Sequence, residues 1–519
     1  MENLSWSEKV KKGGLLFGIP LLLFLLISGY FLTSSTHSLY DFPLDDAWIH
    51  RVYARSLAWG QGLSYNPGEQ ETGATSPLWI LVTAPTHWFE PRWPNAPVVG
   101  VKLIGGLLGM GTIILAALMA RHLIGGLIGP LMAASLWAIE PRLIFSSYSG
   151  MEVNLFVVLL LGLILADWSE KRRWYFLLMS LLPVSRPEGL IVLGLFGGRD
   201  FILVLRKRKP FNLLGWMWVA VPLFVWMGIC FWISGVPLPL PFYQKAQWFL
   251  PSFPLLQKMW QLQAHHGLYP GVVFAVGLLL FGGACFHPDY LGRRSAVFPL
   301  LVVPVVLLLG IVASRGISLG GYYWLRYVDP ADFLLMIAAT IGLSMWASRI
   351  GHWGFWIRRL PREERLPGTV FRRNLPLIAV IVMLSSLPHW WQSVQIKRFH
   401  LWSDARIIHL MNVEVGRWLA THTPPHVSVG VNDAGAIRYF SQRRIIDLLG
   451  LNNKAVAMRR VSVKDLLDHL DWIALYPVWF RHYNLKVFEL RQAFAVNFED
   501  YSLCHCPSQT LITIAERRR

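Results

Sequence analysis

Residues 14–33 read GLLFGIPLLLFLLISGYFLT and contain no charged side chain. An apolar helix of about 20 residues is long enough to cross the hydrocarbon core of a membrane. The preceding segment, MENLSWSEKVKKGG, is basic, as in a signal peptide, but no small-residue cleavage site follows. We therefore interpret this run as a retained signal anchor and as the first membrane span.

The rest of the chain repeats this pattern. The 519 residues are 54% hydrophobic and only 15% charged, whereas a soluble protein carries about 25% charged residues. Apolar runs predict eleven membrane spans, at about 14–33, 98–120, 123–140, 152–168, 174–185, 189–205, 212–233, 271–286, 297–314, 331–347 and 375–391. The predicted fold class is a polytopic α-helical membrane protein.

The net charge of +18 comes from basic tracts between the apolar runs. These tracts are Lys9–Lys12, Arg121, Lys171–Arg173, Arg206–Lys209, Arg293–Arg294 and the 348–374 loop. With eleven spans they all fall on one side, as the positive-inside rule requires. We predict a multi-pass protein of the plasma (inner) membrane with a cytoplasmic N-terminus, which contacts membrane lipid and has no nucleic acid partner.

The last part of the chain has a different composition. Residues 392–519 carry charges throughout and include two strand-like runs, VSVGV (427–431) and RRIIDLL (443–449). This pattern predicts a small soluble α/β domain, which the span count places on the outer face. We divide the chain into a transmembrane domain, 1–391, whose first outer loop is 34–97, and an extracytoplasmic domain, 392–519.

The first outer loop begins with DFPLDDAWIH, residues 41–50. Asp45 and Asp46 suit the N-cap and first turn of a helix over about 47–59, with His50 one turn after Asp46. An aspartate at a helix start is commonly a cap. An adjacent acid pair beside a membrane surface, with a histidine one turn on, is also typical of a catalytic site.

Further ionisable residues lie at the outer ends of spans or in outer loops, and each has a structural and a functional interpretation. They are Glu152 in SGME, Arg186 and Glu188 in SRPEG, Lys245 in FYQKA, Arg326 in LRYVDP and Asp433 in VNDAG. The structural interpretations are, in that order, a first-turn acid, a mutual ion pair, a solvated lysine, an interfacial anchor and a turn residue.

The absence of several well-known motifs argues against other functions. The sequence has no Walker loop, dinucleotide fingerprint, HExxH or GxSxG, so ATP-driven transport, redox chemistry and serine hydrolysis lack support. Cys504, His505 and Cys506 are too few for a zinc site. The alternatives to an enzyme are a lipid or glycan flippase, which would place charges in mid-membrane helices, and a non-catalytic envelope-assembly protein, which would not need the acid pair.

The run DDAWIHRVYARSLAWGQGLSYNPGEQETGATSPLW (45–79) resembles the first outer loop of C-type (GT-C) integral-membrane glycosyltransferases. It is most similar to mycobacterial-type terminal β-(1→2) arabinofuranosyltransferases and related bacterial polyprenyl-phosphate-sugar-dependent transferases. SGME, RPEG, FYQKA, the RY of LRYVDP and DAGAIRYFSQRRIIDLLGL extend the likeness over most of the chain. PLPFYQKA departs from the family's PNTFYAKA, and DPAD replaces a plainer run.

This resemblance implies a polyprenyl-phosphate sugar as donor, a cell-envelope glycan, lipid or protein as acceptor, and a catalytic acid in the first outer loop. By position that acid is Asp45 or Asp46. We prefer Asp45 as general base because Asp46 is better placed to pair with His50.

The remaining roles follow from this chemistry. Arg326, Lys245 and Arg186 are candidates for binding the departing phosphate, and His50, Glu152, Glu188 and Asp433 are candidates for binding substrate. A divalent cation on the second aspartate stays an open alternative, and no metal ligands are assigned.

Overall fold

The computed structural model describes residues 6–208, 210–245, 271–286, 295–315, 325–357, 368–497 and 510–518. Helices dominate it. The α-helices up to the last long one are α1 (Trp6–Leu32), α2 (Thr36–Tyr40), α3 (Asp45–Ala58), α4 (Pro77–Thr83), α5 (Ala96–Ile124), α6 (Ile128–Ala138), α7 (Pro141–Tyr148), α8 (Val153–Trp168), α9 (Arg172–Ser185), α10 (Gly189–Leu205), α11 (Leu213–Ser234), α12 (Leu240–Lys245), α14 (Gly271–Phe286), α15 (Val303–Arg315), α16 (Leu325–Ile357) and α17 (Gly368–Ile408).

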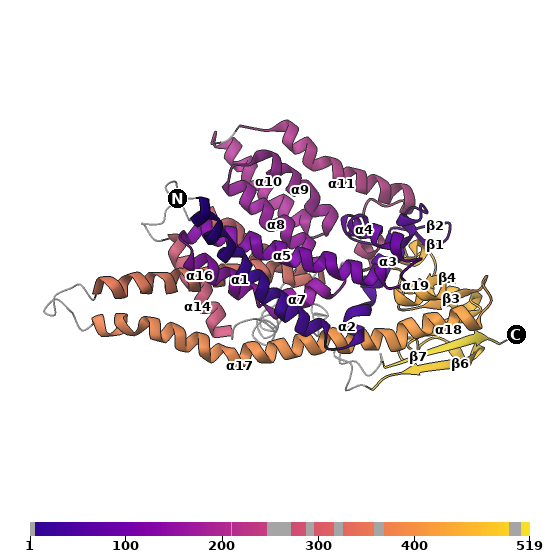
Figure 1. Ribbon diagram of the computed structural model, residues 1–519. Coiled ribbons are helices and arrows are strands. Elements are labelled where there is room, and N and C mark those ends of the chain that lie inside the picture. The colour runs from indigo at the N-terminus through magenta and orange to yellow at the C-terminus, as the bar shows by residue number, and fades with distance from the viewer. Residues whose placement is uncertain are drawn as a thin grey trace.

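The long helices form one bundle with α16 at its centre (Figure 1). The segment Arg326–Trp346 of α16 is apolar and wholly buried, as expected for a helix that packs on all sides. Helices α6, α14 and α15 pack against it. By contrast, α11 exposes large apolar side chains such as Trp218, Phe231 and Trp232, which gives the bundle an apolar outer surface suited to lipid.

Each of the eleven predicted spans overlaps a helix, although the 123–140 run also includes the end of α5 and the 297–314 run includes the π-helical turn η3 (Phe298–Val302) before α15. Four helices in the described residues are long and apolar enough to cross a membrane by themselves: Gly14–Leu32, Ala96–Ile124, Leu213–Ser234 and Arg326–Trp346. Helices α6 and α7 form a fifth candidate, bent by 54°, where the sequence predicted a straight span over 123–140. The polytopic helical fold is thus confirmed, whereas the number eleven stays a prediction.

The C-terminal part folds around a mixed sheet of five strands in the order β4-β3-β5-β7-β6. The strands are β3 (Ser428–Val431), β4 (Arg444–Asp447), β5 (Trp472–Leu475), β6 (Phe488–Ala495) and β7 (Leu511–Arg517), accompanied by α18 (Glu414–His422), α19 (Ala436–Ser441), α20 (Lys454–Ala457) and α21 (Val463–His469). Strand β3 pairs in parallel with β4 and β5, and β7 pairs antiparallel with β5 and β6. The two predicted strands, β3 and β4, are confirmed.

The bundle and the sheet are joined by α17, which runs along one edge of the molecule (Figure 1). This helix continues without a break through the predicted domain boundary at 391/392. It is followed by the π-helical turn η7 (His409–Val413) and then by α18. The sequence placed the boundary where hydropathy falls, but a helix does not have to end there.

The first outer loop lies between the bundle and the sheet (Figure 1). It contains α2, α3, the hairpin β1 (Ser64–Asn66) and β2 (Glu69–Gln70), α4 and the 3-10 turn η1 (Ala84–Phe89). Helix α3 begins at Asp45, and its N-cap, Leu44, makes no side-chain capping bond. The expectation that Asp45 caps its own helix is therefore wrong.

Candidate active site

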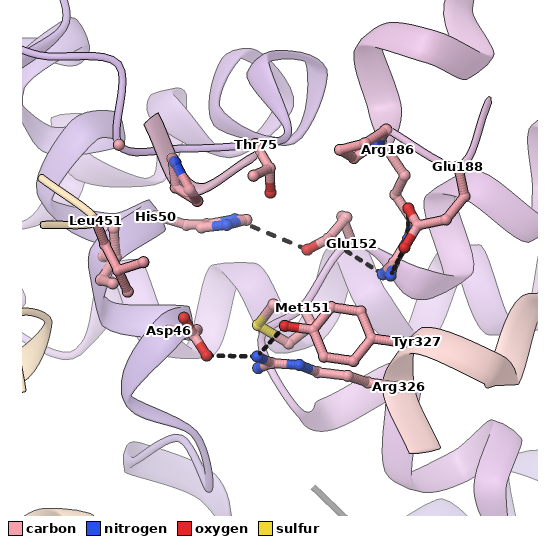
Figure 2. Close-up of a pocket in the computed structure, with 14 residues that line it drawn as sticks. Asp46, His50, Thr75, Met151, Glu152, Arg186, Glu188, Arg326, Tyr327 and Leu451 are labelled. Carbon is pink, nitrogen blue, oxygen red and sulfur yellow. Dashed lines mark hydrogen bonds and ion pairs between the residues drawn. The ribbon is translucent and has the colours of Figure 1, made fainter. Parts of the chain in front are cut away.

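A pocket of about 540 Å³ lies where the first outer loop meets the ends of the bundle helices. Its wall combines α3, the turn before α8, the turn between α9 and α10, and the start of α16 (Figure 2). The lining residues are Asp46, Ile49, His50, Gly73, Thr75, Met151, Glu152, Arg186, Pro187, Glu188, Pro241, Arg326, Tyr327 and Leu451. Four motifs far apart in the sequence thus share one cavity.

Asp46 and Arg326 form the ion pair at one wall of this pocket. The Nη2 of Arg326 lies 2.5 Å from Oδ2 of Asp46 and also donates to the hydroxyl of Tyr327 at 2.9 Å. Arg326 is buried, so its charge acts where water screens it weakly. The pair places a carboxylate and a guanidinium on the same open space (Figure 2).

The opposite wall carries a second charge cluster. Arg186 donates to Glu152 at 2.8 Å and to both carboxylate oxygens of Glu188 at 3.2 Å. The mutual pair of Arg186 and Glu188 weighed from the sequence is present, but Glu152 is its third member. The cluster therefore presents two carboxylates and one guanidinium to the pocket.

His50 lies between the two walls. Its Nδ1 is 3.9 Å from Oε2 of Glu152, too far for a hydrogen bond. Both atoms are buried, and neither has a hydrogen-bond partner among the described residues. Burial lowers the pKa of His50 to about 4, so the imidazole is neutral at pH 7. A neutral ring and an unsatisfied carboxylate oxygen together suit a bridging hydroxyl group.

The SGME turn is fixed by a close contact with α3. Gly150 has φ +83°, and a Cβ there would lie 2.5 Å from the ring of Phe42 and 2.9 Å from Cβ of Ala47. The carbonyl of Gly150 accepts a hydrogen bond from the indole of Trp79. Only glycine fits this backbone conformation without strain, and the contact places Met151 and Glu152 beside α3.

Asp45 points away from the pocket, toward the C-terminal domain. Its two oxygens accept the backbone N–H groups of Gly435 and Ala436, each at 2.8 Å, and the Asn412 side chain at 3.2 Å. It therefore caps α19 from another part of the chain. Burial and the neighbouring Asp433 raise the pKa of Asp45 to about 8.

Asp433 lies beside Asp45 and does not line the pocket. Its carboxylate accepts hydrogen bonds from Asn412, Asn432 and Tyr476. These three donors hold it in the turn after β3, outside the pocket, and its role in substrate binding stays a prediction.

Six of the nine residues predicted from the sequence meet at the pocket: Asp46, His50, Glu152, Arg186, Glu188 and Arg326. Asp45 and Asp433 form a separate pair behind it. Asp45 does not share the pocket with Asp46, because successive residues of a helix point about 100° apart. The side chain of Lys245, the last residue of α12, lies outside the described residues, although Pro241 of the same helix lines the pocket.

The other lining residues were not predicted from the sequence, among them Thr75, Met151 and Tyr327. Thr75 lies in ETGATSP, and Met151 and Tyr327 are direct neighbours of the predicted Glu152 and Arg326. Adjacency to a predicted ionisable residue is the signal by which Met151 and Tyr327 could have been found. The hydrophobic periodicity of the sequence does not tell which neighbours of such a residue face the cavity.

The bundle and the C-terminal domain together have the fold of two solved proteins, an archaeal oligosaccharyltransferase and ArnT. Two solved structures are similar over nearly the whole chain. The oligosaccharyltransferase AglB from Archaeoglobus fulgidus, in complex with an inhibitory peptide and a dolichol-phosphate, has a TM-score of 0.59 and 12% identity over 92% of this chain and 70% of that one. ArnT from Cupriavidus metallidurans, bound to undecaprenyl phosphate, has a TM-score of 0.59 and 11% identity over 95% of this chain and 97% of that one.

Comparisons of sequence add little to this. The profile of one family, a domain of unknown function (DUF8728), matches residues 402–511. No curated protein matches the sequence significantly. At identities of 11–12% the structural likeness establishes the fold, and the function has to be argued from the site.

Proposed function

We propose that this protein transfers a glycosyl group from a polyprenyl-phosphate sugar to a hydroxyl of a cell-envelope glycan, lipid or protein acceptor on the outer face of the plasma membrane. The observation that carries the proposal is that the Asp46 carboxylate and the Arg326 guanidinium form an ion pair in the wall of one pocket. Both structural relatives were solved with a polyprenyl-type phosphate, which supports the donor class.

Asp46 is our candidate for the general base, in place of Asp45. A polyprenyl phosphate is a good leaving group, whereas the acceptor hydroxyl is a weak nucleophile that gains from a positioned carboxylate. Asp46 lines the pocket, while the Asp45 oxygens are committed to Gly435, Ala436 and Asn412. Direct attack of the hydroxyl on the sugar carbon makes the reaction a single displacement with inversion.

Arg326 is our candidate for the donor phosphate. A guanidinium can bind phosphate through two N–H groups at once. When the phosphate takes the place of Asp46 on Arg326, the Asp46 carboxylate is released to accept the acceptor proton. Arg186 is the weaker candidate, since Glu152 and Glu188 already balance its charge.

His50 and Glu152 are our candidates for holding a sugar hydroxyl. Neutral imidazole and carboxylate lie 3.9 Å apart with one unsatisfied atom each, so one hydroxyl can contact both. Glu188 holds Arg186 beside them. Among the described residues the sole group of three close metal-ligating side chains lies outside this pocket, so no step is assigned to a metal ion.

The test uses purified protein in lipid nanodiscs, a panel of polyprenyl-phosphate sugars and acceptor glycans. Asp46→Asn should lower turnover by about 10²–10⁴-fold, the usual contribution of a general base. Asp468→Asn is the matched control, because this aspartate is exposed on α21, and it should keep wild-type turnover. Asp45→Asn should mainly lower thermal stability, since its amide nitrogen would face backbone N–H groups.

Two results would contradict the proposal. One is wild-type turnover in Asp46→Asn, which would remove Asp46 as the base. The other is the absence of transfer from every polyprenyl-phosphate sugar by a wild-type protein that binds those lipids, which would favour a flippase.

A further inference from the structure

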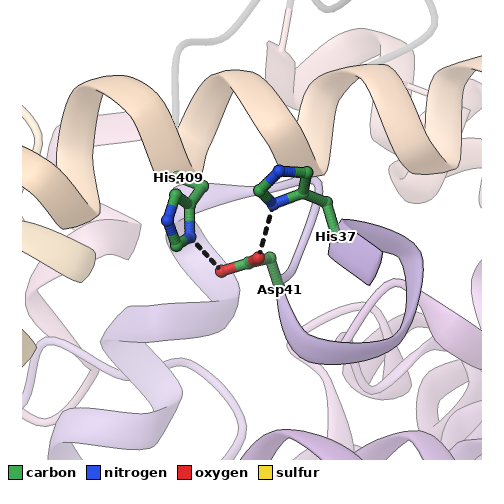
Figure 3. Close-up of side chains that lie close together, drawn as sticks. All are labelled: His37, Asp41 and His409. Atoms are coloured by element: carbon green, nitrogen blue, oxygen red, sulfur yellow. Dashed lines mark hydrogen bonds and ion pairs between the residues drawn. The ribbon is translucent and has the colours of Figure 1, made fainter. Parts of the chain in front are cut away.

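A second group of ionisable side chains lies outside the pocket described above. His37 belongs to α2, Asp41 is the C-cap residue of this helix, and His409 is the first residue of η7 (Figure 3). The Nδ1 atoms of His37 and His409 are each 2.9 Å from a different oxygen of Asp41. The ligand atoms of the three residues all lie within 4.8 Å of one another.

We propose that His37, Asp41 and His409 bind a zinc-type divalent ion that fastens α2 to η7. Two imidazoles and one carboxylate are ligands that zinc prefers. At metal–ligand lengths of about 2.0–2.2 Å, tetrahedral ligand atoms lie roughly 3.3–3.5 Å apart, so the three groups need to move little. His37 and Asp41 are only four residues apart, at the end of α2, and their side chains are already in contact.

The surroundings of His409 support a metal at its Nδ1. Its Nε2 lies 3.4 Å from the carboxylate of Glu414, which Arg417 holds in turn at 2.8 Å. His409 thus has carboxylate oxygens at both ring nitrogens, and a neutral ring can donate to only one of them. A metal at Nδ1 leaves Nε2–H to donate to Glu414, which is the carboxylate–histidine–metal arrangement common in metal sites.

The access to this site and its position in the fold also fit a bound metal ion. The three side chains line a second pocket of about 1030 Å³, through which an ion can enter and a water molecule can complete the coordination. In both of its segments the site is close in sequence to the Asp45–Asn412–Asp433 cluster, because Asp41 precedes Asp45 by four residues and His409 precedes Asn412 within η7. The ion would therefore stabilise the junction between the bundle and the C-terminal domain, independently of the proposed transferase activity.

The test measures zinc per chain in purified protein by mass spectrometry, and the melting temperature before and after chelation and on return of Zn²⁺ or Mg²⁺. A Cys504→Ser, Cys506→Ser background removes these two thiols as a source of adventitious zinc binding. We expect one equivalent of zinc in this background, its loss in the His37→Ala, His409→Ala double variant, and no change in His422→Ala, a control histidine exposed on α18.

A milder variant guards against misfolding of the double variant. Glu414→Gln leaves all three ligands in place and should weaken zinc binding by about 10–100-fold, with the melting temperature of the zinc-free protein unchanged. Zn²⁺, but not Mg²⁺, should raise the melting temperature of the chelated background protein. If the double variant keeps the same zinc content, or if Zn²⁺ leaves that melting temperature unchanged, the three residues are only a hydrogen-bonded clamp.

Discussion

Two adjacent aspartates in this protein have different surroundings. Asp46 pairs with Arg326 at the pocket, whereas Asp45 accepts two backbone N–H groups at the start of α19. The 100° rotation between neighbouring helical residues is sufficient to send one side chain to the cavity and the other to the adjoining domain. Asp45 therefore acts as a cap, but for a helix about 390 residues away.

The pair of Asp45 and Asp433 should make stability depend on pH. Burial and Asp433 raise the pKa of Asp45 to about 8, and burial raises the pKa of Asp433, while an unfolded aspartate titrates near 4. On this pair the folded state therefore holds a proton more tightly than the unfolded state, so the contribution of the pair to the free energy of unfolding should fall as the pH rises from about 4 to about 8.

Thermal unfolding at a series of pH values measures this effect. Asp433→Asn removes the like charge and should flatten the dependence, whereas Asp468→Asn should leave it as in the wild type. The same pH dependence in Asp433→Asn as in the wild type would contradict the protonated pair.

Arg326 should affect the donor more than the fold. Arg326→Ala removes the proposed phosphate ligand, and charge-assisted hydrogen bonds contribute about 1.5–3 kcal/mol, so the Kd for undecaprenyl phosphate should rise about 10–100-fold. Arg326→Lys keeps the charge without the bidentate geometry, and its Kd should lie between those of the wild type and Arg326→Ala. Lipid binding and melting temperature measured on the same samples separate the effects; equal lipid affinity in all three proteins would make Arg326 an interfacial anchor.

At the scale of elements, α3 serves two partners. Ile49 and His50 face the pocket together with Asp46. Trp48 packs against the rings of Tyr439 and Phe440 of α19, and Arg55 stacks on Tyr439 and donates to its carbonyl. This short helix is therefore buried on both faces, although its sequence carries four charged residues. Any shift of α19 is expected to reach the pocket through α3.

The crossing of α14 and α16, the helix that carries Arg326 at its start, depends on glycine. A Cβ at Gly342 would lie 2.2 Å from the carbonyl oxygen of Gly277 and 3.0 Å from Cβ of Phe281. Such close backbone approach is typical of small residues between membrane helices. Gly342→Ala should lower stability by about 1–3 kcal/mol through overpacking, measured by thermal unfolding in detergent. Gly283→Ala, with no atom within 4 Å of the new Cβ, is the matched control, and equal losses in the two variants would argue against this crossing.

At the scale of the whole molecule, the first outer loop joins the bundle to the sheet domain. Asn66 of β1 accepts from the backbone N–H of Ile445 and donates to its carbonyl, each at 2.9 Å, and so caps the edge of β4. Tyr65 donates to the carbonyl of Ala434, and Tyr53 donates to Asn452. The domain that the sequence separates by composition is thus an integral wall of the site, with Leu451 in the pocket itself.

Loosening this contact should be measurable. Asn66→Ala leaves the two buried backbone groups of Ile445 unsatisfied, at about 1–3 kcal/mol each, so amide exchange in β4 and protease sensitivity of the 428–452 segment should increase. Asp468→Asn, at an exposed position on α21 of the same domain, is the control. The same exchange rates in Asn66→Ala as in Asp468→Asn would show that the domain is held elsewhere.

The sequence alone determined the polytopic helical class, the positions of the long helices, the C-terminal domain with its first two strands, and the six residues that meet at the pocket. Hydropathy over about 20 residues and charge near span ends are local properties, so they can be read without coordinates. The tertiary structure decided which of the two adjacent aspartates faces the pocket, that Asp433 lies behind it, and that His409 joins His37 and Asp41. These outcomes depend on contacts between residues more than 360 positions apart, and no local pattern encodes the angle at which two distant segments pack.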